Sequence, residues 1–363
     1  MQVRVEKVAH GGHFIARNEG QVIFIRDTAP GELVDIEITS KAKGFLRGNV
    51  LNVIEPSPQR ITPPCAYAGK CGGCDFQHLN VAYQRQLKAD VIKEQFSRIA
   101  KMDIDVTVHE VAPTTHYRTH IRGVANEAGQ FGIYASRSHD IIPIKDCLIA
   151  GEELHVEKIA IEKYEPMEPI EVPQGDQIRE VKGKKLLVKA GAFWQRHRNA
   201  PETLTTQFLK LANLKAGDHL LDLYGGVGLF TSVALDVIGP GGRVDLIESS
   251  VPATESAKEN FKKYENVKIL RDDVVKGLKN IRRADVVVLD PPREGADKKV
   301  IAELIRLQPR CIVYVSCDPA SLARDSRALH DAGYPLQDLR AFDLFPMTHH
   351  IECVALFTQS KVS

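Results

Sequence analysis

The sequence predicts an α/β protein in which a small β-barrel and a central α+β segment precede a parallel, doubly wound domain. From residue 193 onward, apolar strands alternate with helical stretches, the pattern of a parallel sheet covered by helices. Residues 1–55 contain short strands separated by turn residues. A proline-rich joint over residues 56–64 then leads into a cysteine-rich segment, a helix and further strands.

Length and composition limit the possible classes of protein. The chain has 363 residues, enough for two or three domains with a sizeable core. Lys and Arg number 48 against 47 Asp and Glu, and 43% of residues are hydrophobic. These values exclude a disordered chain, a coiled coil and a wholly basic nucleic-acid binder. Because we find no signal peptide, membrane-length apolar run or extra apolar surface pattern, we expect a cytoplasmic monomer that does not bind membranes.

The N-terminal segment is typical of a small closed barrel of the OB type. Candidate strands cover residues 3–8, 22–25, 33–39 and 45–54. Closure removes edge strands, and such barrels often bind oligonucleotides. Lys41, Lys43 and Arg47 could line a nucleic-acid face, but seven basic and seven acidic residues make the segment neutral, so a solvated hairpin is an equally good interpretation.

The seven cysteines are clustered unevenly. Cys65, Cys71 and Cys74 form a compact group with five and two intervening residues, and Cys147 follows at a distance. Disulfides are rare in the cytoplasm, whereas four thiolates can hold a [4Fe–4S] cluster or a zinc ion. Zinc sites more often pair two local Cys–Cys units, so three local ligands and one remote ligand favour the cluster. A structural and a redox role both stay open.

The central segment combines a helix with strands. We expect the helix over residues 81–100, where apolar residues recur at helical spacing, and strands within residues 117–149. Residues 164–176 carry three prolines and several acids, so we expect a loop there. The predicted domains are 1–57, 58–192 and 193–363.

The C-terminal domain begins with a pattern typical of a nucleoside site. An apolar strand over residues 219–224 leads into a turn with glycines at 225, 226 and 228, which lets a ligand approach the backbone closely. The next strand ends in Glu248, 26 positions after Asp222, near the spacing of a ribose-hydroxyl partner. Thr231 replaces the third glycine of the pyrophosphate fingerprint, so the nucleoside half of S-adenosylmethionine fits better than a dinucleotide. An α/β domain without a nucleoside is the alternative.

Two later strands also end in reactive residues. Asp290 and Cys317 each follow an apolar strand, and ligands bind outside the carboxyl ends of parallel strands, so both should face one crevice. We interpret Cys317 as a nucleophile, and we expect nearby backbone N–H groups to lower the pKa of its thiol. The alternative is a thiol buried in the core. Cys311 and Cys353 lie in apolar strands and are expected to be core thiols.

Glu352 is the candidate general base. It precedes a short apolar strand, and a carboxylate in apolar surroundings gains a raised pKa that suits proton abstraction. The alternative is an ordinary exposed glutamate. His349 or His350 could take the same role, but adjacent side chains on an extended chain point in opposite directions, so at most one would face the site.

Taken in order, these motifs resemble the RNA uracil-C5 methyltransferases, which make 5-methyluridine in tRNA or 23S rRNA. The resemblance covers nearly the whole chain. Residues 1–57 resemble the TRAM domain, and Cys65, Cys71, Cys74 and Cys147 match the [4Fe–4S] ligands of the iron–sulfur branch. The remaining matches are Phe193-Trp194-Gln195, residues 222–230, Asp290-Pro291-Pro292-Arg293, Ser316-Cys317-Asp318-Pro319 and Phe345-Pro346-x-Thr348-x-His350-x-Glu352.

The resemblance implies a Rossmann-like class I methyltransferase domain, with S-adenosylmethionine and a [4Fe–4S] cluster as cofactors and RNA as partner. It also implies that Cys317 adds to uracil C6, that C5 takes the methyl group and that Glu352 removes the C5 proton. The target base must leave its stack to enter such a pocket. The residues implied in cofactor binding are Gln195, Tyr224, Glu248, Asp273 and Asp290. Of these, Gln195 and Asp290 could instead bind the uracil edge, and His349 or Asp318 could replace Glu352.

Three departures from the family pattern affect what can be transferred. Leu229 stands where many members carry Asn, Asp318 replaces Asn, and the stretch between Cys147 and Phe193 is shorter than in larger members. The choice of RNA and of uridine is therefore not given. An iron–sulfur redox or radical enzyme is a competing reading, although radical enzymes usually have Cys-x3-Cys-x2-Cys. An RNA-binding protein with a degenerate site is another, although Cys317 and Glu352 are intact.

Overall fold

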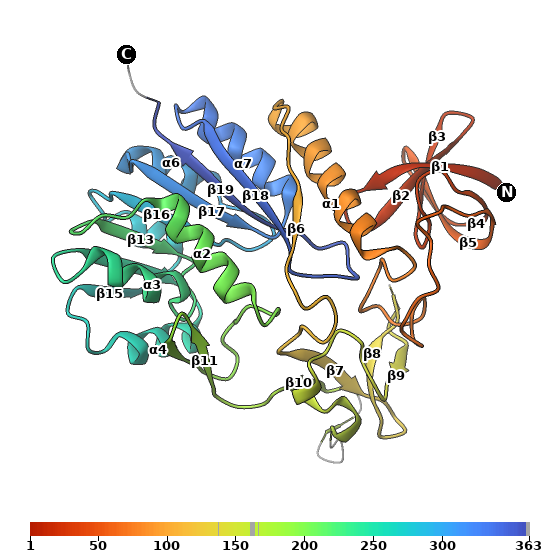
Figure 1. Cartoon of the computed structure of the whole chain (residues 1–363), viewed down its shortest axis with the longest axis horizontal. Helices are drawn as coiled ribbons and strands as arrows, with labels where there is room; N and C mark the ends of the chain where they lie inside the picture. The colour runs from red at the N-terminus through yellow and green to blue at the C-terminus, as the bar shows by residue number, and fades with distance from the viewer. Residues whose placement is uncertain (137, 160–163, 166, 361–363) are drawn as a thin grey trace. The chain divides into compact units, whose positions relative to one another are not determined.

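The computed structural model describes residues 1–136, 138–159, 164–165 and 167–360 (Figure 1). The chain divides into two compact units, each built from separated segments. The first unit consists of Met1–Val91, Ala112–Pro173 and Asp343–His350. The second unit consists of Ile92–Val111, Gln174–Phe342 and Ile351–Ser363.

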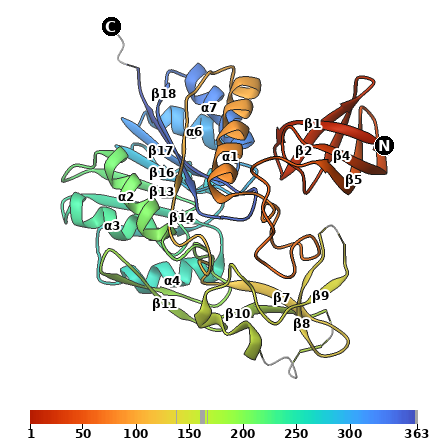
Figure 2. The same cartoon turned by 45° about the vertical axis from the view of Figure 1, so that its right-hand side comes forward.

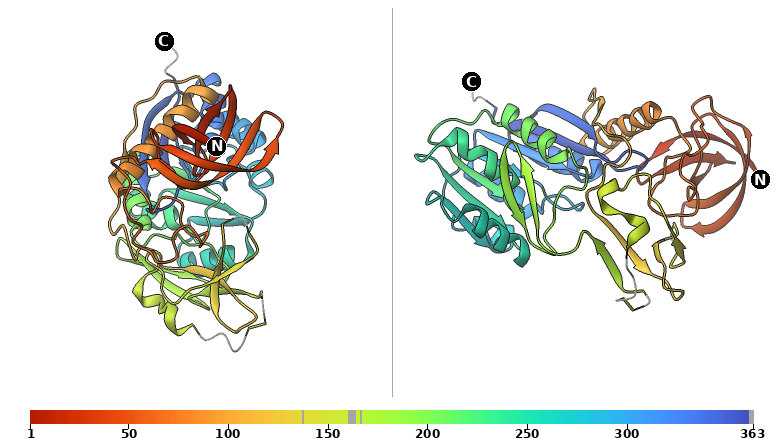
Figure 3. Two further views of the ribbon diagram at one scale, coloured as in Figure 1. Left: turned by 90° about the vertical axis from the view of Figure 1, so that its right-hand side faces the viewer. Right: turned by 60° about the horizontal axis from the view of Figure 1, so that its bottom comes forward.

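The first unit begins with a closed five-stranded barrel, drawn in red in Figure 3. Its strands pair in the order β1-β2-β3-β5-β4, and their bounds are Gln2–Ala9, His13–Asn18, Gln21–Ile25, Leu33–Ala42 and Phe45–Glu55 for β1 to β5. Alternate side chains such as Val3, Val5, Phe14 and Ala16 are buried, as expected when one face of each strand lines the interior. The predicted closed barrel is confirmed, but β2 was missed.

The rest of the first unit contains a four-stranded antiparallel sheet of order β10-β7-β8-β9. The bounds of β7 to β10 are Ile121–Ala125, Phe131–Tyr134, Ile141–Pro143 and Pro169–Val172, and two 3₁₀ turns cover Glu152–Leu154 and Val156–Lys158. The loop predicted over 164–176 was therefore wrong at β10, because Ile170 pairs with Gly123 and is fully buried. Pro166 of that prediction lies outside the described residues.

The predicted central helix is present as α1 (Val81–Gln95), and a π-helical turn over Phe96–Ala100 continues it to the expected end. Lys101 then adopts a left-handed φ of 59° and ends the helix. No helix among the described residues combines the length and the apolar character that crossing a membrane requires.

The second unit is built on an eight-stranded sheet of order β15-β14-β13-β16-β17-β19-β18-β6. From β6 upward its strands span Val108–Glu110, His219–Leu223 (β13), Arg243–Glu248 (β14), Val267–Arg271 (β15), Val286–Leu289 (β16), Cys311–Ser316 (β17), Leu336–Asp343 (β18) and Glu352–Thr358 (β19). Strands β13 to β17 are parallel, whereas β19 runs antiparallel to both β17 and β18. A separate hairpin joins β11 (Gln177–Val181) to β12 (Lys184–Val188).

Helices cover both faces of this sheet (Figure 2). Their bounds, for α2 to α7, are Ala200–Ala212, Leu229–Ile238, Val251–Phe261, Val274–Leu278, Lys298–Leu307 and Pro319–Asp331. With helices on both faces, the central strands are buried: each residue of β16 and of β17 is inaccessible or nearly so. This confirms the predicted doubly wound α/β domain. The strand order reverses between β13 and β16, where such sheets open a ligand crevice.

Candidate active site

The predicted site residues of the second unit follow consecutive strands of its sheet. Tyr224, Glu248, Asp290 and Cys317 stand at the carboxyl ends of β13, β14, β16 and β17. Because these strands are parallel neighbours, all four residues lie along one edge of the sheet. The reversal of strand order falls in the middle of this set, between the ends that carry Tyr224 and Asp290.

The glycine turn after β13 is held by Glu248. One carboxylate oxygen of Glu248 accepts the Gly226 N–H at 3.0 Å, and the other accepts the Ser250 N–H at 2.7 Å. At Gly228, φ is +93° and a Cβ would lie 2.2 Å from the ring of Phe261, so only glycine fits there. The turn therefore leaves bare backbone at the carboxyl edge of the sheet, with the half-buried carboxylate of Glu248 beside it.

Asp222, near the end of β13, binds the start of the helix that follows the glycine turn. Its Oδ2 accepts both the N–H and the hydroxyl of Thr231, at 3.0 and 2.6 Å. Burial, together with the charges of Asp290 and Glu248, raises the pKa of Asp222 to about 7. Thr231, which made a dinucleotide fit less well in the sequence, thus fixes the first turn of α3 to the end of β13.

Tyr224 and Asp273 are two further residues predicted to bind the cofactor. Tyr224 is half-buried at a left-handed φ of 56°, and burial raises its pKa to about 12. Asp273 is exposed and caps α5, because its Oδ1 accepts the Val275 N–H at 3.0 Å. The second oxygen of this carboxylate is not used in that cap.

Gln195 and Asp290 lie together although 95 residues separate them in the sequence. The Nε2 group of Gln195 donates to Asp290 Oδ2 at 3.2 Å, and Gln195 is buried. Desolvation raises the pKa of Asp290 to about 7, so this carboxyl group exchanges its proton near neutrality. The structure therefore brings together two residues that the sequence could only associate through a family resemblance.

Cys317 and Glu352 lie close together at the ends of two paired strands. Strands β17 and β19 pair antiparallel as far as Ser316 and Cys353, and Cys317 follows Ser316 while Glu352 precedes Cys353. The charge of Glu352 acts on the Cys317 thiol. Glu352 is 3% exposed, and burial and the charge of Asp290 raise its pKa well above the usual range. The alternative of an ordinary exposed glutamate is therefore excluded, and a thiol and two carboxyl groups share this edge.

The expected direction of the Cys317 pKa shift was wrong. Burial, followed by the charges of Glu352 and Asp290, raises the pKa of the Cys317 thiol to about 12. The opposing charge comes from Arg293. The available sequence signal was a cation three positions after Asp290. Near neutral pH Cys317 is therefore a thiol, and the carboxyl groups of Glu352 and Asp290 lie close enough for their charges to act on it.

The alternative bases have other contacts. Asp318 caps α7, because its Oδ1 accepts the N–H groups of Ala320 and Ser321 at 3.0 and 2.8 Å. An Asn would cap in the same way, which accounts for this departure from the family pattern. His349, in the first unit, contacts Asp75 Oδ2 at 2.6 Å through Nδ1.

The segment that precedes Glu352 is anchored within the first unit. The carbonyl of Met347 accepts the N–H groups of Asp75 and Phe76, both at 3.0 Å. The Met347 N–H donates to Gln84 Oε1 at 2.9 Å. Asp75 and Phe76 directly follow Cys74, so the predicted metal-binding segment contacts the chain that leads into the candidate base.

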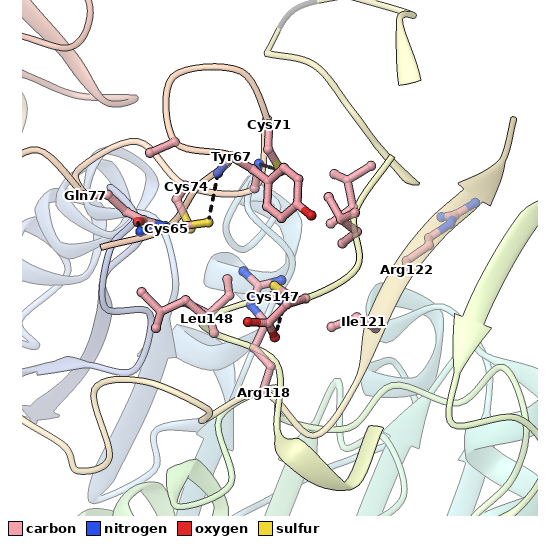
Figure 4. A pocket seen from close by; sticks show the side chains of 16 residues that line it. Cys65, Tyr67, Cys71, Cys74, Gln77, Arg118, Ile121, Arg122, Cys147 and Leu148 are labelled. Carbon is pink, nitrogen blue, oxygen red and sulfur yellow. Dashed lines mark hydrogen bonds between the residues drawn. The ribbon is translucent and has the colours of Figure 1, made fainter. Parts of the chain in front are cut away.

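The four cysteines predicted as cluster ligands line one cavity of about 100 Å³ (Figure 4). All are free thiols, and Cys71, Cys74 and Cys147 have raised pKa values because they are buried and repel one another when ionised. Arg118 lines the same cavity and counteracts this shift. Among the described residues, no three Cys, His, Asp or Glu side chains are grouped so that they could hold a metal ion.

Cys311 and Cys353 differ from Cys317 and from the four cysteines that line the cavity. They are 5% and 1% exposed, and each lies inside a strand of the large sheet. Burial raises the pKa of Cys311 to about 12 and raises that of Cys353 further. They are core thiols, as the sequence predicted.

Comparison with known proteins agrees with this geometry. A crystal structure of the Pyrococcus abyssi tRNA (uracil-54, C5)-methyltransferase in complex with S-adenosyl-L-homocysteine matches 98% of this chain and 99% of its own. Its TM-score is 0.74 at 20% sequence identity, a likeness that establishes the fold. The molecule therefore has the fold of a methyltransferase.

Sequence comparisons identify the family. The model of the tRNA (uracil-5-)-methyltransferase family matches residues 171–360, and the TRAM domain model matches residues 1–51. An uncharacterized RNA methyltransferase of Streptomyces avermitilis is 37% identical over 98% of this chain and 97% of its own length. One from Bifidobacterium longum is 32% identical over 99% and 96%. The chain belongs to the tRNA (uracil-5-)-methyltransferase family and is an RNA methyltransferase.

Proposed function

We propose that this enzyme methylates C5 of a uridine in RNA with S-adenosylmethionine, using Cys317 as nucleophile and Glu352 as general base. The observation that supports the proposal is the position of Cys317 and Glu352 next to Ser316 and Cys353, the last pair of β17 and β19, with Asp290 close enough for its charge to act on both. A buried base and a thiol at one sheet edge suit covalent catalysis at a flat, poorly nucleophilic ring.

The Cys317 thiol loses its proton to the Asp290 carboxylate, so that Glu352 stays ionised for the later step. The thiolate forms a bond to C6 while the C5–C6 π electrons become an enolate. S-adenosylmethionine, when bound, would supply the methyl group that C5 accepts with the enolate electrons, and S-adenosylhomocysteine would leave with the electrons of the broken bond between sulfur and the methyl carbon. Glu352 then takes the C5 proton, the C5–C6 double bond re-forms, and the bond between sulfur and C6 breaks to release the thiolate.

The residues near the strand ends can bind the two substrates. Glu248, beside the bare backbone of the glycine turn, suits the ribose hydroxyls of S-adenosylmethionine. Asp273 and Tyr224 suit the rest of its nucleoside, and Gln195 and Asp290 suit either its methionine part or the uracil edge. Asp290 has a pKa of about 7, so it can act as hydrogen-bond donor or acceptor.

The test is to incubate the enzyme with S-adenosylmethionine and unmodified total RNA and to detect 5-methyluridine by mass spectrometry after digestion. We expect 5-methyluridine from the native enzyme and from Cys311→Ala, whose thiol is buried on the same strand. Cys317→Ala should form none. Methylation by Cys317→Ala, or a different methylated nucleoside from the native enzyme, would overturn the proposal.

We also propose that Cys65, Cys71, Cys74 and Cys147 hold a [4Fe–4S] cluster. Four free thiols around a cavity suit a cluster better than a single ion, on which ligands converge closely. Arg118 and Arg122 line the cavity and would offset the negative charge of four thiolates. Anaerobic purification should yield iron and acid-labile sulfide in equal amounts, whereas stoichiometric zinc would contradict the proposal.

RNA is the proposed partner, and both tRNA and 23S rRNA remain candidate substrates. The barrel supports RNA binding, because it matches the TRAM model and barrels of this kind often bind oligonucleotides. The cytoplasmic location, the monomeric state and the boundaries 1–57, 58–192 and 193–363 stay predictions.

A further inference from the structure

The loop between β16 and α6 carries two of the charged groups that act on Cys317, namely Asp290 and Arg293. Its far end is bound by residues of β17 and α7. The N–H of Ala296 donates to Tyr314 Oη at 2.9 Å and to Asp325 Oδ2 at 2.8 Å. The Tyr314 hydroxyl in turn donates to the same Asp325 oxygen at 2.7 Å.

Arg324 also binds the loop. Its Nη2 donates to the Glu294 carbonyl at 2.7 Å, and its Nε donates to Asp325 Oδ1 at 2.9 Å. Gly295, at a φ of +79°, fits between them, since a Cβ there would lie 2.6 Å from both Arg324 Nη2 and Asp325 Oδ2. We call Tyr314, Arg324 and Asp325 the α7 clamp.

The clamp is a buried polar network and not incidental surface contact. Tyr314 is 0% exposed and Asp325 3% exposed, and both carboxylate oxygens of Asp325 have donors. Burying a carboxylate costs free energy unless it accepts hydrogen bonds. The Asp325 carboxylate accepts them from the Ala296 N–H, the Tyr314 hydroxyl and Arg324, all around one loop. Apolar packing would join α7 to the sheet at less cost.

The clamp lies on the elements that carry the nucleophile. Tyr314 precedes Cys317 by three residues on β17, and α7 begins directly after Asp318. The opposite end of the loop is fixed separately, because the Asp290 N–H donates to the Leu223 carbonyl at 3.3 Å. Loosening the clamp would therefore displace Arg293 more than Asp290.

We propose that Tyr314 and Asp325 are positioning residues that hold the Asp290–Ala296 loop, with the exposed Arg293, beside the end of β17 that carries Cys317. The groups whose charges act on Cys317 come from three elements: Glu352 on β19, Asp290 and Arg293 on the loop, and Asp318 at the start of α7. Arg293 is the cation in this set and opposes the shift caused by burial and the carboxylates, so displacing it should make the thiolate form less readily.

The first test measures the free enzyme. We would follow alkylation of Cys317 by iodoacetamide across pH, quantifying the Cys317 peptide by mass spectrometry. Tyr314→Phe keeps the ring and removes the hydroxyl; it should slow alkylation about threefold below the thiol pKa, because less thiolate forms. Tyr334→Phe is the matched control, since its buried hydroxyl donates to the Pro309 carbonyl away from the loop and its rate should equal that of the native enzyme.

A double-mutant cycle tests the route through Arg293. Arg293→Gln should slow alkylation, and adding Tyr314→Phe should slow it no further. The proposal would be overturned if the rate losses of Arg293→Gln and Tyr314→Phe multiply in the double variant. It would also be overturned if Tyr314→Phe is alkylated at the native rate, or if Tyr334→Phe slows alkylation equally. Asp325→Asn carries the same test if Tyr314→Phe fails to fold, as thermal unfolding would reveal.

The catalytic readout rests on the proposed function, but the alkylation readout does not. If Cys317 is the nucleophile, Tyr314→Phe should lower kcat about threefold and leave KM for RNA unchanged, because the clamp acts on the thiol and not on RNA binding. Unchanged alkylation would refute the clamp. Altered alkylation in an enzyme that makes no 5-methyluridine would refute only the proposed function.

Discussion

The molecule places cysteines in two contrasting surroundings. Cys317, in the second unit, lies among the carboxyl groups of Glu352, Asp290 and Asp318, with Arg293 as the opposing cation. The four cysteines of the first unit share one cavity with Arg118 and Arg122. In both places burial is the largest cause of a raised thiol pKa, but the neighbours differ.

This difference indicates what each site can do. A thiol beside carboxyl groups has proton acceptors close by, which suits the transient bond to carbon that we propose for Cys317. Several buried thiols whose ionised forms repel one another lose their protons more readily when a cation binds them, which suits the proposed metal site.

The largest expected effect is a complete separation of these two roles. Cys317→Ala should lower methylation by more than about 1,000-fold, because a nucleophile cannot be replaced by its neighbours, and should leave the iron content unchanged. Cys74→Ser should instead lose most of the iron. Methylation assays and iron analysis of both variants, with Cys311→Ala as the shared control, check this. Loss of iron from Cys317→Ala would contradict the separation.

A smaller effect concerns pH. Asp290 has a pKa of about 7 and that of Glu352 is raised well above its usual range, so the base becomes ionised only as pH rises past the value of an ordinary glutamate. The single-turnover rate should therefore increase about tenfold from about pH 6 to about pH 8. Rapid-quench assays with bound RNA measure it. A rate that is flat over this interval would show that no group with a raised pKa limits the reaction.

The smallest effect is expected at Asp318. Asn accepts the same N-terminal N–H groups of α7, so Asp318→Asn should retain activity within about twofold. Asp318→Ala removes the cap and should lower the free energy of unfolding by about 1 kcal/mol. Denaturant unfolding and methylation assays compare the two variants. A large loss of activity in Asp318→Asn alone would assign the carboxylate a chemical role.

Much of the site could be predicted from sequence, because buried parallel strands are apolar runs and the polar residues that end them share one sheet edge. That logic located Glu248, Asp290 and Cys317. It could not give the Cys317 pKa, since the carboxyl groups that raise it lie 27 and 35 residues away and approach only through the pairing of β16, β17 and β19. The α7 clamp was hidden for the same reason.

The fold was missed where tertiary pairing outweighs local signals. β2 (His13–Asn18) mixes polar and apolar residues between two turns, and closure of the barrel supplies its partners β1 and β3. β10 (Pro169–Val172) has a proline and an acid typical of a loop, yet it pairs with β7 and buries Ile170. In both cases the strand depends on a neighbour that composition does not reveal.

The central claim is the covalent route through Cys317 with Glu352 as base, and trapping the adduct tests it most directly. Glu352→Gln cannot remove the C5 proton, so RNA should stay attached to the protein after reaction with S-adenosylmethionine. Mass spectrometry of the Cys317 peptide should then show a methylated uridine, and Cys317→Ala in the same background should show none. A Glu352→Gln enzyme that releases 5-methyluridine at the native rate, or an adduct on another residue, would contradict the account.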